Sequence, residues 1–79
     1  MAITALTAEQ RQTLRKAREQ AGLTQADLAE RLGIVSQYVT MIERGKKAAS
    51  LDVLQRLGNE LGLAITVKTT VTIKRKRPS

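Results

Sequence analysis

The sequence predicts a mainly α domain of four to five helices, followed by one β-strand near the C-terminus. Three observations support this fold class. Apolar residues recur at helical spacing in four successive segments, most of which begin at a polar capping residue or end at a glycine. After residue 62 the apolar residues alternate with polar ones, which is the period of a strand. A chain of 79 residues has material for one core only, so residues 1–79 are assigned to a single domain.

The first two helices are predicted from their caps. Thr7 and Gln10 have the spacing of a capping box, and an apolar face follows them. Thr24 is a good N-cap for the second helix, and Asp27 lies in its first turn, where a negative charge is favourable. Gly33 is predicted to end this helix, because glycine readily adopts the left-handed conformation that a sharp turn needs.

Two more helices are expected before the strand. The third runs from about Val35 to Arg44, and Ser50 caps the fourth. The apolar residues of the fourth helix that we expect to be buried are Leu51, Leu54, Leu57 and Leu61. The helical core therefore covers residues 7–62.

Residues 63–73 are predicted to form a single strand, because no Gly, Pro, Asn or Asp interrupts the alternation and favours a hairpin. Such a strand has no partner in its own chain. We expect it to pair with the same strand of a second subunit and to make a homodimer through Leu63, Ile65 and Val67. The alternatives are a strand that lies along its own helices and a largely disordered end.

The net charge of +7 is concentrated at one end of the chain. Five of the fourteen basic residues follow residue 67, and no acidic residue accompanies them. A basic excess favours a polyanionic partner, but a run such as KRKR at a chain end is more often a solvated segment. Residues 74–79 are therefore predicted to form a basic disordered tail.

The composition argues against several classes of function. The chain has no cysteine and no histidine, and Tyr38 is its only aromatic residue. This composition removes disulfides, the usual zinc sites and the commonest general base, so we expect no enzyme, no metal and no cofactor. No stretch is apolar enough to cross a bilayer or to direct export, so we expect a cytoplasmic protein without membrane contact.

The most informative segment is residues 25–42, which has the pattern of two helices crossing over a short turn. Ala29 is small where the first helix would be crossed, and Gly33 allows the turn. Val39 and Ile42 are three positions apart, so both can face the core. An ordinary helical hairpin in a small bundle would show some of the same features.

The stretch GLTQADLAERLGIVSQYVTMIERGK resembles the helix-turn-helix of the Cro and lambda-repressor type, the XRE family, and the resemblance covers about residues 14–61. The Leu-Thr-Gln opening, the Leu-Ala pair, the Leu-Gly turn and the final Ile-Glu-Arg-Gly stand as in that family. One departure is Val35, where the family often has a capping Ser or Thr. Ser36 can cap a helix that starts one residue later, or it can contact DNA.

The resemblance implies a nucleoid-associated, sequence-specific transcriptional repressor whose third helix enters the major groove. Base contacts are then expected from the outward residues Ser36, Gln37, Tyr38, Thr40 and Met41. Phosphate contacts are expected from Thr24, Gln25, Arg44, Lys46 and Lys47. The family commonly joins its first and third helices by a salt bridge, which here corresponds to Arg18 and Glu43.

A helix-turn-helix followed by a dimerising strand resembles the HipB-type antitoxins, which pair with a HipA-type kinase toxin and repress their own operon. This resemblance implies a homodimer on palindromic double-stranded operator DNA, with such a toxin as a further partner. One alternative is a phage-type or restriction-controller regulator without a toxin. Another is a protein-binding adaptor that docks an acidic partner through the basic tail.

Overall fold

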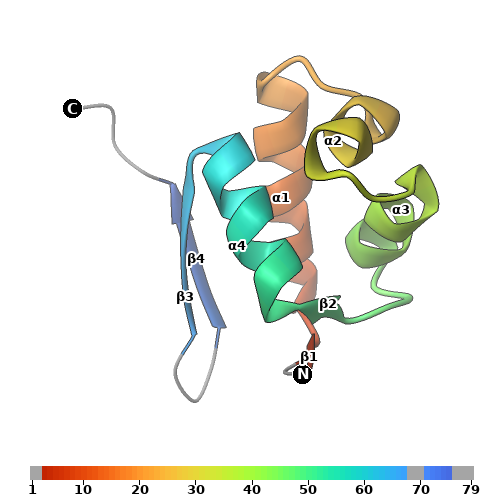
Figure 1. Ribbon diagram of the computed structural model, residues 1–79. Coiled ribbons are helices and arrows are strands. Elements are labelled where there is room, and N and C mark those ends of the chain that lie inside the picture. Colours follow the sequence, from red (N-terminus) through yellow and green to blue (C-terminus); the bar gives the residue numbers. More distant parts are fainter. Residues whose placement is uncertain (1–2, 68–70, 76–79) are drawn as a thin grey trace.

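The helices of the chain assemble around one core, and a β-hairpin lies beside the last of them (Figure 1). The computed structural model describes residues 3–67 and 71–75. In chain order the elements are β1 (Ile3–Thr4), α1 (Ala8–Gln20), α2 (Gln25–Leu32), α3 (Ser36–Arg44), β2 (Ala49–Ser50), α4 (Leu51–Leu61), β3 (Leu63–Val67) and β4 (Val71–Arg75).

The first two helices begin at reciprocal capping boxes, as predicted. The hydroxyl of Thr7 accepts the Gln10 N–H at 3.1 Å, and the Gln10 side chain accepts the Thr7 N–H at 3.0 Å. Thr24 and Asp27 repeat this arrangement, with both distances at 3.0 Å. Each box satisfies two N–H groups that have no partner inside the helix.

The turn between α2 and α3 depends on one glycine. Gly33 has a φ of +68°, in the left-handed region that a residue with a Cβ adopts at a cost. Val35 then has extended backbone at the N-cap of α3, and its side chain makes no capping hydrogen bond. The recognition-type helix therefore begins at Ser36, one residue later than the predicted start.

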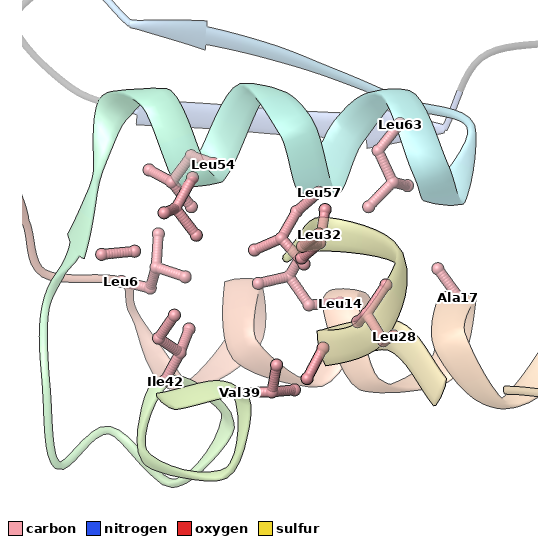
Figure 2. Packing of buried hydrophobic residues seen from close by; sticks show 13 residues of the cluster. Leu6, Leu14, Ala17, Leu28, Leu32, Val39, Ile42, Leu54, Leu57 and Leu63 are labelled. Carbon is pink, nitrogen blue, oxygen red and sulfur yellow. The ribbon is translucent and has the colours of Figure 1, made fainter. Parts of the chain in front are cut away.

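The core is aliphatic and draws on every helix, as Figure 2 shows. Its buried members are Leu6, Leu14, Ala17, Leu28, Ala29, Leu32, Val39, Ile42, Ala49, Val53, Leu54, Leu57 and Leu63. Val39 and Ile42 are 2% and 3% exposed, so they fix the orientation of α3. The outward face of α3 is thereby determined by the packing of its inward face.

β3 lies against α4 through a close backbone approach at Gly58. A Cβ at this position would lie 2.8 Å from the carbonyl oxygen of Leu63, closer than real Cβ atoms come to such an atom. Glycine thus permits the contact, and Leu63 is 2% exposed in the core. Within α4, Leu54 and Leu57 are buried as predicted, whereas the flanking Leu51 and Leu61 are half-buried.

A short strand pair joins the N-terminal segment to the residues before α4. β1 pairs with β2 in antiparallel register, with Ile3 opposite Ser50 and Thr4 opposite Ala49. The guanidinium of Arg11 donates to the Leu6 carbonyl at 2.8 Å and supports the same segment. Strands of two residues are too short to show a period, so the sequence pattern predicts no element before residue 7.

The structure corrects the prediction of one continuous strand over residues 63–73. β3 and β4 form an antiparallel pair within the chain, with Ile65 opposite Ile73 and Thr66 opposite Thr72. Ile65 and Ile73 are partners on one face of the pair, so the alternation is the same for one long strand and for two strands joined by a short connection. Pairing also satisfies the backbone groups that the prediction left to a second subunit. The connecting residues 68–70 lie outside the described residues.

The boundary of the predicted basic tail moves as well. Lys74 and Arg75 were assigned to the disordered segment 74–79, but both belong to β4, where Lys74 lies opposite Ala64. The Lys74 side chain is exposed, and the solvent face of a strand tolerates such a charge. Residues 76–79 lie outside the described residues.

Candidate nucleic-acid interface

α3 presents a mostly polar outer face. Ser36, Gln37, Met41 and Arg44 are exposed, while Val39 and Ile42 of the same helix are buried. Residues 37, 41 and 44 are spaced by four and three, so they form a stripe along one side of the helix. This stripe offers an amide, a thioether and a guanidinium to a ligand that lies along the helix.

Thr40 lies at the edge of this stripe and is engaged by a residue of α2. The Thr40 hydroxyl is half-buried and lies 2.6 Å from Oε1 of Gln25. The Gln25 amide nitrogen in turn donates to Oε1 of Glu43 at 3.1 Å. The side chain of Gln25 thus links the start of α2 to two residues of α3, and its predicted phosphate contact stays a prediction.

The carboxylate of Glu43 also accepts two hydrogen bonds from the guanidinium of Arg18, one at each oxygen. Nε of Arg18 lies 2.8 Å from Oε2, and Nη2 lies 3.1 Å from Oε1. The third donor, Nη1, reaches the Leu23 carbonyl at 2.9 Å. The predicted pair is thus present as a bidentate salt bridge that joins α1 to α3, and Arg18 also reaches the residue before the N-cap of α2.

This salt bridge is largely withdrawn from water. The side chains of Arg18 and Glu43 are 10% and 6% exposed. The hydrogen bonds to Glu43 raise the pKa of Arg18 above its ordinary value, although burial acts in the opposite direction. The loss of either partner would leave a buried charge unpaired.

The network also fixes the direction of each hydrogen bond. An ionised Glu43 can only accept, so it must receive the amide N–H of Gln25. The carbonyl oxygen of Gln25 then faces Thr40, whose hydroxyl donates to it at 2.6 Å, with the Ser36 carbonyl as a second acceptor at 3.2 Å. The oxygen of Thr40 is left with acceptor capacity only, so a ligand group that bonds to it must be a donor.

The N-terminus of α2 adjoins this hydrogen-bond network, because Gln25 is the first residue of the helix. The N–H of Thr24 is occupied by Asp27, which limits the predicted phosphate contact at Thr24 to its hydroxyl. These hydrogen bonds from Thr24 lower the pKa of Asp27 below its ordinary value. By helix geometry the N–H groups of Gln25 and Ala26 lack a carbonyl partner within α2, so both can bind an anion.

The basic residues predicted to contact phosphate lie at the last residue of α3 and just after it. Arg44, Lys46 and Lys47 are all exposed, and Gly45 between them closes the helix in a left-handed conformation. The Lys46 N–H donates to the Met41 carbonyl at 2.8 Å, which holds the turn against the helix. These three cations therefore extend the positive charge beyond the C-terminal end of the α3 stripe.

Tyr38 is placed differently from the other predicted base contacts. Its ring is half-buried and packs against the hydrophobic core, where the prediction placed it outside. The Tyr38 hydroxyl accepts the Ser50 N–H at 3.4 Å, and Nζ of Lys47 lies 5.3 Å from the ring centroid. Tyr38 thus connects α3 to the start of α4 and carries a cation above its ring.

The residues predicted for the dimer lie away from α3. Figure 1 shows the β3–β4 hairpin on the opposite side of α4 from α3. Leu63 is buried in its own chain and Ile65 is half-buried against the same core, whereas the Val67 side chain is outside the described residues. The apolar face assigned to a second subunit is therefore used, at these two positions, by the chain itself.

The described residues form neither a cluster of metal ligands nor a membrane-spanning helix. In residues 3–67 and 71–75, no three acidic side chains gather in an arrangement that could hold a metal ion. No helix in the described part of the chain is long and apolar enough to span a membrane.

Sequence reasoning missed one exposed residue of this interface. Val35, at the N-cap of α3, is 67% exposed and stands beside Ser36. The signal in the sequence for this residue is that an apolar side chain stands where a helix usually has a capping Ser or Thr. Its accessibility depends on the direction in which the turn after Gly33 leads the chain, which the sequence pattern does not specify.

The sequence of the chain is similar to those of known helix-turn-helix proteins. The helix-turn-helix family model matches residues 14–67. An uncharacterized HTH-type transcriptional regulator of Methanothermobacter thermautotrophicus is 38% identical over 52 residues, which cover 66% of this chain and 75% of the relative. The uncharacterized HTH-type transcriptional regulator YqaF of Bacillus subtilis is 37% identical over 57 residues, covering 72% of this chain and 75% of the relative. The chain therefore belongs to the XRE family of helix-turn-helix proteins.

Proposed function

We propose that this protein is a transcriptional repressor that binds a specific duplex operator through α3. The observation that carries the proposal is the division of α3 between a buried side and an exposed polar stripe. Val39 and Ile42 hold the helix on the core, while Ser36, Gln37 and Met41 are free to meet base edges in the major groove. Gln37 can pair bidentately with adenine, and Met41 can lie against a thymine methyl.

Thr40 contributes a directional contact to this readout. Because its hydroxyl hydrogen is donated to Gln25, it can accept only from a base that carries an exocyclic amino group. In the major groove these groups are N6 of adenine and N4 of cytosine. For Tyr38 we propose a supporting role, since its hydroxyl and ring are engaged by Ser50 and Lys47.

Phosphate contacts flank the base-reading stripe on both sides. Arg44, Lys46 and Lys47 supply cations at the C-terminal end of α3 and just beyond it, and the first-turn amides of α2 supply neutral donors at the positive end of a helix. Charged and neutral contacts differ in their salt dependence, since only cations replace condensed counterions. Affinity should therefore fall with salt mainly through the three cations.

We further propose a homodimer on a palindromic operator, with the contact moved from a shared strand to the outer edge of the hairpin. In the described residues the second sheet contains β3 and β4 alone, so each strand has one edge without a β partner. Such an edge is suited to pairing with a second copy about a two-fold axis. An operator with about 5 base pairs inserted between its half-sites, half a helical turn, should lose the tight binding of a dimer.

The narrower proposal is a HipB-type antitoxin that represses its own operon and binds a HipA-type kinase toxin. Its support was a single dimerising strand after the helices, and the hairpin in that place weakens it. We therefore prefer a regulator without a toxin, of the phage or restriction-controller type. A kinase-like open reading frame next to this gene, whose product co-purifies with the chain, would restore the antitoxin role.

The deciding experiment is selection of operator sequences from random duplexes with the full chain, followed by competition against a scrambled duplex at about 0.15 M salt. The proposal expects one palindromic consensus and a clear preference for it. Equal affinity for both duplexes would contradict it and would favour the protein-binding adaptor, which needs no base contacts.

A further inference from the structure

Val35 combines an exposed apolar side chain with a position at the N-cap of a helix. Among the described residues, Val35 and Met41 are the large apolar side chains that are exposed, at 67% and 44%. A single exposed apolar residue is common and needs no explanation by itself. The position of Val35 at a helix N-cap is the second feature, and it does call for one.

The N-cap of α3 differs from those of the other helices. Thr7, Thr24 and Ser50 each accept a backbone N–H from the first turn of their helix, whereas Val35 offers no acceptor. Valine is among the poorest N-cap residues, and serine or threonine would satisfy one of the unpaired N–H groups. Stability alone therefore does not account for valine at this position.

The location of Val35 shows what the side chain can meet instead. It directly precedes Ser36 and Gln37, at the end of α3 whose residues contact base edges in helix-turn-helix complexes. This step rests on the proposed function. The base edges in the major groove carry polar donors and acceptors, together with one apolar group, the C5-methyl of thymine.

We infer that Val35 is a specificity-determining residue that packs against the C5-methyl of a thymine in each half-site. A serine at this position would turn its hydroxyl back to the first-turn N–H groups of α3 and would offer no methyl group to the groove. The valine leaves the helix uncapped and presents two methyl groups to the base. The cap of α3 is thus exchanged for recognition of one base pair.

The test replaces each thymine of the selected operator, one at a time, by deoxyuridine, which lacks only the C5-methyl. For the unmodified protein, one thymine per half-site should show a loss of affinity of about four-fold, the equivalent of one buried methyl group at ~0.8 kcal/mol. Val35→Ala and Val35→Ser should bind the thymine and deoxyuridine duplexes equally at that position. Both variants should keep the response of the unmodified protein at every other thymine, which serves as the internal control.

Thermal unfolding separates the two roles of the residue. Val35→Ser should raise Tm by about 4 to 8 °C through the restored cap, whereas Val35→Ala, an equally poor cap, should not. An unchanged deoxyuridine response in both variants, or a Val35→Ser protein that is no more stable, would overturn the inference. A consensus without a Val35-dependent thymine would also overturn it and leave the proposed function intact. Failure to select any consensus would instead remove the proposed function.

Discussion

The hydroxyl of Thr40 lies 2.6 Å from Oε1 of Gln25, which ties the exposed helix α3 to the first residue of α2. Gln25 is held in turn by Glu43, and Glu43 by Arg18. One buried charge pair thereby sets the orientation of an amide and, through it, the direction in which a hydroxyl at the interface can bond. If Thr40 contacts a base as we propose, this network links the buried charge pair to the base preference at that position.

Gln25→Met should break this link while keeping the length of the side chain. Without the Gln25 carbonyl, the Thr40 hydroxyl can donate either to the Ser36 carbonyl, 3.2 Å away, or to a base, so the base preference at its position should widen beyond adenine and cytosine. Loss of the hydrogen bonds should lower the free energy of unfolding by about 1 kcal/mol. Operator selection with the variant measures the first effect, with Thr40→Val as the control that abolishes the contact. A consensus identical to that of the unmodified protein would show that Thr40 does not read a base.

Glu43→Gln should be strongly destabilising, because it leaves the guanidinium of Arg18 buried without its charge partner. We expect a loss of about 3 to 5 kcal/mol in the free energy of unfolding. Glu19→Gln is the matched control, since it removes the same charge from the exposed pair of Arg15 and Glu19, which is worth about 0 to 1 kcal/mol. Urea denaturation of both variants measures the difference. Similar losses in the two would mean that burial of the Arg18 pair has little energetic effect.

Asp27 should make the stability of the protein depend on pH in the acid range. The hydrogen bonds from Thr24 lower the pKa of Asp27 in the folded chain below its unfolded value of about 3.9. Its contribution is therefore fully present above about pH 4 and is lost as the pH falls through the lowered folded pKa. In Asp27→Asn this part of the pH profile should be absent.

Asp52→Asn is the control for that profile, because Asp52 lies in the first turn of α4 and carries the same charge. Midpoints of urea unfolding between about pH 2 and pH 7 measure the effect. An Asp27→Asn protein whose midpoints follow those of the unmodified protein at every pH would show that the capping box does not favour the ionised carboxylate.

The features that the sequence predicted correctly are local. The caps at Thr7, Thr24 and Ser50 each involve a backbone group three residues away, so the pattern of neighbouring residues specifies them. The buried positions of α3 follow from helical periodicity for the same reason. The pair of Arg18 and Glu43, 25 residues apart, was identified only through the family resemblance.

The features that the sequence did not predict depend on which surfaces meet. The hairpin has the same alternation as one long strand, and only packing of Ile65 and Ile73 on the core distinguishes the two. The packing of the half-buried Tyr38 ring against the core depends on the approach of Ser50, twelve residues later. The engagement of Gln25 likewise requires Thr40 to lie across the turn, which no local pattern encodes.

The most direct test of the account compares Gln37→Ala with Lys46→Ala on the selected operator and on scrambled DNA over a series of salt concentrations. Lys74→Ala is the matched control for charge, since Lys74 lies on β4, across α4 from α3 (Figure 1). Gln37→Ala should lose about 1 to 3 kcal/mol on the operator alone and keep the salt slope. Lys46→Ala should weaken both duplexes alike and reduce the slope by about one unit, while Lys74→Ala should change neither. Identical behaviour of the Gln37 and Lys46 variants would contradict the division of this interface into base-reading and phosphate-binding residues.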